Sequence, residues 1–157
     1  MPRDPESSRD GFHDALASAV AAHVADVRGV TAPRRLSGGA SQETWAFDAE
    51  TARGVLPLIL RRKPGGGAGD APLLGSAIPL ETEAALIDLA GGAGVPVPRV
   101  HFVLESADGL GSGFVMERLE GETLAPRILR DEALAAVRPR LARECGGILA
   151  RIHSLPR

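Results

Sequence analysis

Residues 36–48 read Leu36-Ser-Gly-Gly-Ala-Ser-Gln-Glu-Thr-Trp-Ala-Phe-Asp48, and their centre has almost no side-chain bulk. A strand-like run at 33–36 leads in, and a second run at 44–48 leads out with large apolar residues alternating with small or polar ones. The backbone N–H groups of a turn made by Gly38, Gly39, Ala40 and Ser41 could approach an anion closely. A plain β-hairpin, in which the glycines only supply positive φ angles, fits the same residues, and the motif alone does not separate the two readings.

Length, composition and charge exclude several classes of protein. The chain has 157 residues, of which 44% are hydrophobic and 24% charged, as in one ordinary globular domain or part of one. A net charge of −2 provides no long-range attraction to nucleic acid or to an anionic membrane. Four Phe, one Trp and no Tyr also argue against the stacking platforms that bind single-stranded nucleic acid.

Cysteine usage and the N-terminus indicate where the chain would work. Cys145 is the only cysteine, so no internal disulfide can form. Residues 1–9 are polar, lack the apolar core of a signal peptide and read as a disordered leader. No apolar run approaches the length of a membrane span. We therefore expect a cytoplasmic protein with no membrane partner.

The first half of the chain predicts one helix followed by three strands. Apolar residues recur at helical spacing over 11–28, where Gly29 would end the helix. The glycine hairpin supplies two strands, and Val55–Arg61 supplies the third, with Pro57 indicating an edge or the start of regular pairing. Residues 64–76 read as a flexible, glycine-rich loop.

The second half predicts a helix, two strands and further helices. The helix covers 79–90 and the strands 99–104 and 114–119, and a short helical segment at 131–137 is followed by a longer helix from Pro139 to about His153. The last helix has an apolar stripe made of Leu141, Cys145, Ile148, Leu149 and Ile152. Because most strands are joined by short links, we expect an α+β fold with an antiparallel sheet of about five strands.

One carboxylate of the 79–90 helix is predicted to face inward. Glu83 lies on the same side of the helical wheel as Leu86, Ile87 and Ala90, whereas Glu81 and Asp88 lie on the outer side. A carboxylate on a core-facing stripe must be paired to offset its loss of hydration. Arg61, which ends an apolar strand, is the predicted partner, and the alternative is a Glu83 side chain that reaches out to water at the helix edge.

Six segments in sequence order resemble the aminoglycoside phosphotransferase and choline-kinase-like family, whose members have a protein-kinase-like fold. They are Leu36–Ser41, Leu58–Pro64, Glu83–Leu86, Val95–Arg99, Phe114–Glu122 and Leu149–His153. The resemblance implies that 10–120 form the N-terminal lobe and that 121–157 form the hinge and the first helices of a truncated C-terminal lobe. It also implies ATP and Mg²⁺ as cofactors and a small-molecule hydroxyl compound as phosphate acceptor.

The resemblance assigns cofactor-binding roles to nine residues. Gly38, Gly39, Ala40 and Ser41 would cover the ATP phosphates, although they depart from the protein-kinase glycine signature. Arg61 would bind phosphate where kinases usually have lysine, and Glu83 would hold Arg61 in place. Backbone groups of Glu117 and Leu119 would bind adenine, with Met116 beside the ring. The alternative role for Met116 is ordinary core packing.

The family's catalytic loop, with its His-Gly-Asp sequence, does not occur in the chain, and neither does the later metal-binding Asp segment. We therefore assign no catalytic and no metal residues, and we expect this chain to be inactive by itself, as a fragment of a kinase. His13, His23 and His101 share no metal-ligand spacing, and Cys145 reads as a small core residue. The alternative functions are a non-catalytic interaction or dimerisation module and a plain α+β domain. We also expect the apolar stripe of the last helix to promote self-association.

Overall fold

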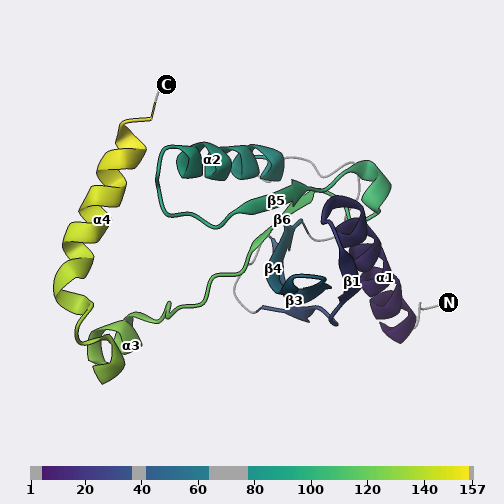
Figure 1. The fold of residues 1–157 in the computed structure, drawn as a ribbon, viewed down its shortest axis with the longest axis horizontal. Coiled ribbons are helices and arrows are strands. Elements are labelled where there is room, and N and C mark those ends of the chain that lie inside the picture. Colours follow the sequence, from purple (N-terminus) through teal and green to yellow (C-terminus); the bar gives the residue numbers. More distant parts are fainter. Residues whose placement is uncertain (1–4, 37–41, 64–77, 156–157) are drawn as a thin grey trace.

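The computed structural model describes residues 5–36, 42–63 and 78–155. The predicted phosphate-binding residues Gly38, Gly39, Ala40 and Ser41, and the predicted loop up to residue 76, lie outside these ranges. Figure 1 shows the arrangement of the elements. In chain order they are α1 (Pro5–His23), β1 (Val27–Val30), β2 (Arg34–Arg35), β3 (Glu43–Thr51), β4 (Gly54–Arg62), α2 (Leu80–Gly92), β5 (Val100–Val103), a 3₁₀ turn η1 (Ser106–Asp108), β6 (Gly113–Glu117), α3 (Ala125–Arg130), a 3₁₀ turn η2 (Glu132–Leu134) and α4 (Arg138–His153).

The strands form one antiparallel sheet in the order β1-β3-β4-β6-β5, with β2 also paired to β3. The predicted α+β class is confirmed, and the described residues form six strands where we expected about five. Strand β1 is the addition. Val27, which we placed in the first helix, pairs with Thr51 of β3, and Gly29 lies inside β1 instead of ending the helix. The chain leaves the helix through Asp26, whose φ is 61°, a value that Asp tolerates better than most residues.

Pro57 lies inside β4 and pairs with Asp48 of β3. The backbone of Asp48 bonds to Thr31 and not to Pro57: the Asp48 carbonyl accepts from the Thr31 N–H, and the Asp48 N–H donates to Thr31 Oγ1, each at 2.9 Å. The missing N–H of Pro57 therefore falls on the side of β6, one residue beyond the β4–β6 ladder that begins at Leu58. The prediction that Pro57 precedes regular pairing is confirmed for that ladder.

Helix α1 covers one face of the sheet (Figure 1). Its residues Leu16, Ala19 and Val20 are buried against strand residues that include Phe47 and Leu60. The helix begins at Pro5, so residues 5–9 are helical and the expected leader over 1–9 needs correction for them.

Helix α2 covers the opposite face, over β5 and β6. Leu80 and Ala84 are buried against Phe114, with Ile87 packed at the edge of this cluster. The predicted inward position of Leu86 is wrong, because its side chain is 49% exposed. Glu83 is half-buried and Glu81 is exposed, as the helical wheel predicted.

The chain leaves the sheet at the end of β6 and reaches α4 through an extended segment and α3 (Figure 1). Pro139 lies in the first turn of α4, as predicted, whereas α3 was not predicted and 131–137 contains only the 3₁₀ turn. No residue of α4 is buried, and Cys145 is exposed instead of lying in a core. None of the helices in the described ranges is long and apolar enough to cross a membrane.

Candidate functional site

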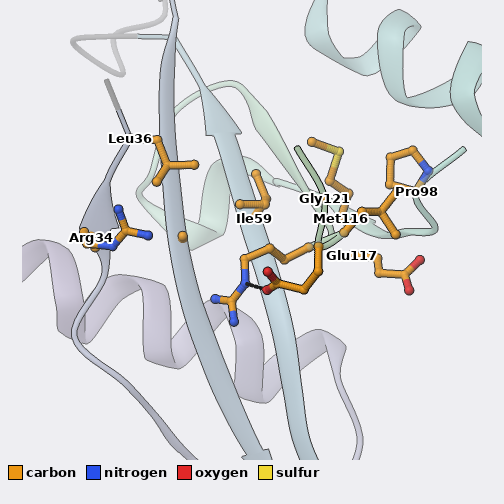
Figure 2. A pocket seen from close by; sticks show the side chains of 11 residues that line it. Arg34, Leu36, Ile59, Pro98, Met116, Glu117 and Gly121 are labelled. Atoms are coloured by element: carbon orange, nitrogen blue, oxygen red, sulfur yellow. Dashed lines mark ion pairs between the residues drawn. The ribbon is translucent and has the colours of Figure 1, made fainter. Parts of the chain in front are cut away.

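A pocket of about 470 Å³ lies on the α2 face of the sheet. Its floor is a cross-strand row in which Ala46 of β3 pairs with Ile59 of β4, and Ile59 pairs with Met116 of β6. Figure 2 shows Ile59 between Leu36 on one side and Met116 on the other. The remaining lining residues are Arg34, Pro98, Glu117, Arg118, Leu119, Glu120 and Gly121. The pocket is therefore apolar on the sheet and polar along the segment that follows β6.

The backbone of residues 117–119 forms one wall of this pocket. The Glu117 N–H donates to the Arg99 carbonyl at 2.8 Å, so only the Glu117 carbonyl remains a candidate to bind a ligand. Within the described residues, the Leu119 N–H donates to no protein acceptor. One backbone acceptor and one backbone donor thus stand on adjacent parts of the wall.

Arg61 and Glu83 form an ion pair, as we predicted from their positions in the sequence. Arg61 Nη2 lies 3.2 Å from Glu83 Oε1, and the two side chains are 36% and 23% exposed, respectively. Because side chains two apart on a strand share a face, Arg61 lies on the same face as Ile59. The pair thus lies on the face that carries the pocket and α2.

Arg61 has a second partner that we did not predict. Its Nε donates to Gln42 Oε1 at 2.7 Å, a bond made possible by the pairing of Thr44 with Arg61. Gln42 directly follows the run of small residues at 38–41, and this position was the only signal in the sequence. The guanidinium is therefore held by Gln42, which lies just before β3, and by Glu83 of α2.

Another unpredicted charged residue is Arg118, which lies between Glu117 and Leu119, the two residues whose backbone groups are predicted to bind adenine. Its Nη2 lies 2.8 Å from Asp48 Oδ1, and its Nε lies 3.6 Å from Glu120 Oε1, the pair drawn as a dashed line in Figure 2. Its Nη1 donates to the Phe47 carbonyl at 3.3 Å. Arg118 thus connects the pocket wall to β3.

A separate charged cluster lies on the α1 face. Glu43 accepts hydrogen bonds from Trp45 Nε1 at 3.2 Å and from Arg62 Nε at 2.9 Å, and Arg62 stacks over the Phe12 ring at 4.3 Å. Burial alone would raise the pKa of Glu43, but these hydrogen bonds and the charges of Arg62 and Arg35 lower it overall. This cluster attaches α1 to the sheet and lies away from the pocket.

Two histidines of the described residues, His13 and His23, have structural contacts. His13 Nε2 lies 3.0 Å from the Val30 carbonyl, and His23 stacks on Phe102 and lies 3.5 Å from Asp108 Oδ2. Burial, together with the charge of Arg99, lowers the pKa of His101 and favours its neutral form. Within the described ranges, no three His, Cys, Asp or Glu side chains lie together as the ligands of a metal ion would.

The antiparallel sheet, with α2 on the pocket face and joined to the central strand β4 by an ion pair, has the architecture of the N-terminal lobe of a protein-kinase-like fold. The model of the phosphotransferase enzyme family matches residues 33–157, and the chain belongs to this family. A search among curated proteins found no match to the chain. The match begins just before β2, so α1 and β1 lie outside it.

Proposed function

We propose that this chain provides the ATP-binding lobe of a small-molecule phosphotransferase, which transfers the γ-phosphate of ATP to a hydroxyl group. The observation that carries this proposal is the Arg61–Glu83 ion pair at 3.2 Å, on the sheet face that holds the pocket. In kinase-like enzymes, such a pair orients a cation toward the α- and β-phosphates. Family membership supports phosphoryl transfer as the reaction class.

The pocket suits an adenine ring. Its volume of about 470 Å³ falls within the usual range for small-molecule sites. The sheet side, formed by Ala46, Ile59 and Met116, offers apolar surface to a flat ring. The Glu117 carbonyl could accept from the adenine amino group, and the Leu119 N–H could donate to a ring nitrogen. These two groups would set the orientation of the base.

The phosphates would extend from the adenine toward Arg61. Two of the guanidinium nitrogens of Arg61 are engaged, Nε by Gln42 and Nη2 by Glu83. Since arginine carries further N–H groups, the remaining ones can bind phosphate oxygens without breaking either contact. Gln42, which binds this guanidinium, directly follows the small residues 38–41 in the sequence. We propose that residues 38–41 also contact the phosphates.

The proposal assigns nucleotide binding, and not complete catalysis, to these residues. Phosphoryl transfer requires a carboxylate that orients the acceptor and carboxylates that hold Mg²⁺. The chain contains no His-Gly-Asp sequence, and the described residues contain no carboxylate cluster that would hold a metal. Mg²⁺ would neutralise charge on the bound phosphates, and groups other than these residues would hold it.

Titration calorimetry with ATP on three variants of the 157-residue chain tests the proposal. Arg61→Ala should weaken binding about 10- to 150-fold, which corresponds to about 1.5–3 kcal/mol for a charge-assisted hydrogen bond. Glu83→Gln should weaken binding less, because Arg61 keeps its contact with Gln42. The matched control Glu81→Gln, on the exposed side of the same helix, should bind ATP as the wild type does. Equal affinity of wild type and Arg61→Ala, or no ATP binding by wild type, would contradict the proposal.

A further inference from the structure

We propose that Arg118 is a positioning residue of the nucleotide site, which fixes the pocket wall at Leu119 by tying it to Asp48 of β3. This inference rests on the proposed function, because it concerns how the adenine-binding backbone is held. It adds a residue that neither the family membership nor the sequence pattern assigns. The evidence comes from the contacts of Arg118, the burial of one carboxylate oxygen of Asp48, whose side chain is otherwise 32% exposed, and the path of the chain after β6.

Arg118 is bound to the sheet through both its backbone and its side chain. The backbone N–H donates to the Pro57 carbonyl of β4 at 3.0 Å. The guanidinium reaches one strand further, to Asp48 Oδ1 at 2.8 Å and to the Phe47 carbonyl at 3.3 Å. One residue therefore bridges the end of β6, β4 and β3.

The burial of Asp48 Oδ1 explains why this bridge is needed. The atom is shielded from water and accepts no well-aligned hydrogen bond within the described residues. The Arg118 charge at 2.8 Å is what offsets this burial, although the angle of the contact is poor for a hydrogen bond. The second acidic neighbour, Glu120, is 89% exposed and lies 3.6 Å away, so water screens its attraction. Asp48 is thus the main anchor.

The chain after Arg118 has few other attachments to the sheet. The Glu117 N–H and the Arg118 N–H bond to the Arg99 and Pro57 carbonyls, respectively. Within the described part of the chain, no backbone hydrogen bond holds residues 119–121 to a strand. The Leu119 N–H is the next donor along the chain, so its position depends on how firmly Arg118 is held. A site whose backbone is already in place pays less ordering entropy on binding.

The experiment compares ATP with inorganic tripolyphosphate as ligands of the whole chain, because only ATP uses the adenine wall. Arg118→Gln should raise the Kd for ATP by at least about fivefold through lost pre-organisation and leave the Kd for tripolyphosphate unchanged. Arg118→Lys keeps the charge without the two-pronged contact and should restore part of the affinity. Asp48→Asn should act in the same direction as Arg118→Gln. The combined variant should lose less than the sum of the two single losses.

A second measurement does not depend on nucleotide. Amide hydrogen exchange of the ligand-free chain should be faster at Leu119 in Arg118→Gln than in wild type, with exchange in the core strands unchanged. The matched control is Arg53→Gln, which removes an exposed arginine in the β3–β4 turn and should alter neither readout.

Unchanged ATP affinity together with unchanged exchange at Leu119 in Arg118→Gln would overturn the inference. Equal losses for ATP and tripolyphosphate would also overturn it, since they would indicate general damage to the lobe. If wild-type chain bound neither ligand, the proposed function would be wrong. The exchange rate at Leu119 would then still decide whether Arg118 fixes this segment.

Discussion

At the scale of single residues, Glu43 shows how one carboxylate can order several neighbours. It accepts from Trp45 and Arg62 and lies 3.5 Å from Arg35, while its own side chain is only 13% exposed. Removing this acceptor would leave a half-buried arginine without its charge partner. The stability of the α1 face should therefore depend on the ionisation of Glu43.

We predict that this dependence appears on acidification. The folded chain lowers the pKa of Glu43, so the stabilisation is fully present above the ordinary glutamate pKa and is lost as the pH falls through the lowered folded value. Glu43→Gln should lower the free energy of unfolding by about 1–3 kcal/mol near neutral pH and by much less in acid. The free energy of unfolding should therefore vary less with pH in this variant than in the wild type. Urea unfolding at a series of pH values, followed by Trp45 fluorescence, measures the effect.

The control for this experiment is Glu50→Gln, an exposed glutamate at the other end of the same strand. It should leave the slope of unfolding free energy against pH close to that of the wild type. Parallel profiles for wild type and Glu43→Gln would show that the Glu43 contacts do not stabilise the fold.

At the scale of elements, the start of β6 leaves no room for a side chain where it meets β4. A Cβ atom added at Gly113 would lie 2.5 Å from the Arg61 carbonyl oxygen and 2.9 Å from Arg62 Cβ. Both neighbours belong to β4, so neither can move without disturbing the sheet ladder. Gly113 is thus required where β6 meets the strand that carries Arg61.

Gly113→Ala should destabilise the chain by about 1–3 kcal/mol, as overpacking in a core does. It should also weaken ATP binding if the proposed role of Arg61 is correct, because β4 must shift. Gly146→Ala is the matched control, since no atom lies within 4 Å of the added Cβ in α4. That change should stabilise the helix by up to about 1 kcal/mol. Urea denaturation of the two variants would refute this prediction if Gly113→Ala unfolded at the same concentration as wild type.

Sequence patterns predicted most elements but not all of their boundaries. Over 24–30, the valines recur every third residue, as in a helix, but valine also favours strands, and pairing of Val27 and Val30 with β3 decides in favour of the strand. In α2, the wheel placed Glu83 correctly but turned Leu86 inward. The actual contact face runs through Leu80 and Ala84, because β5 and β6 meet the helix there. Helical periodicity gives the face only to within about one residue position.

The sequence predicted those residues of the candidate site whose contacts follow from their position within a single strand or helix. Arg61 ends an apolar strand and Glu83 faces the sheet, and these two facts together predict the ion pair. Gln42 and Arg118 were missed because their partners depend on cross-strand register. Thr44 must lie opposite Arg61, and Arg118 must reach past Pro57 to Asp48. Periodicity within one strand carries no information about either relation.

At the scale of the whole molecule, α4 stands apart from the sheet and exposes apolar side chains. Leu149 is 51% and Ile152 is 42% exposed, and no residue of the helix is buried. Within the described contacts, one hydrogen bond from Arg151 to the Gly94 carbonyl, at 3.1 Å, connects α4 to the loop before β5. Exposed apolar faces of this kind tend to become buried against another protein surface.

We therefore predict that the isolated chain self-associates through α4 as its concentration rises. The double substitution Leu149→Gln and Ile152→Gln should shift the weight-average mass toward the monomer, because it removes the apolar surface. Leu129→Gln in α3, at a side chain 67% exposed, is the control and should leave association unchanged. Sedimentation equilibrium measures the mass, and a wild-type chain that stays monomeric at every concentration would rule this out.

The order of strands in the sheet has a consequence for how the pocket forms in time. Strands β3 and β4 follow one another through a tight turn, so they can pair soon after the chain collapses. The pairing of Ile59 with Met116 closes a long segment that contains α2 and β5, and the entropy of that closure must be met first. We therefore expect the floor of the pocket to be completed late in folding. A ligand seated on that floor would contact β3, β4 and β6 together, and would therefore stabilise the state in which β6 is docked on the β3–β4 hairpin.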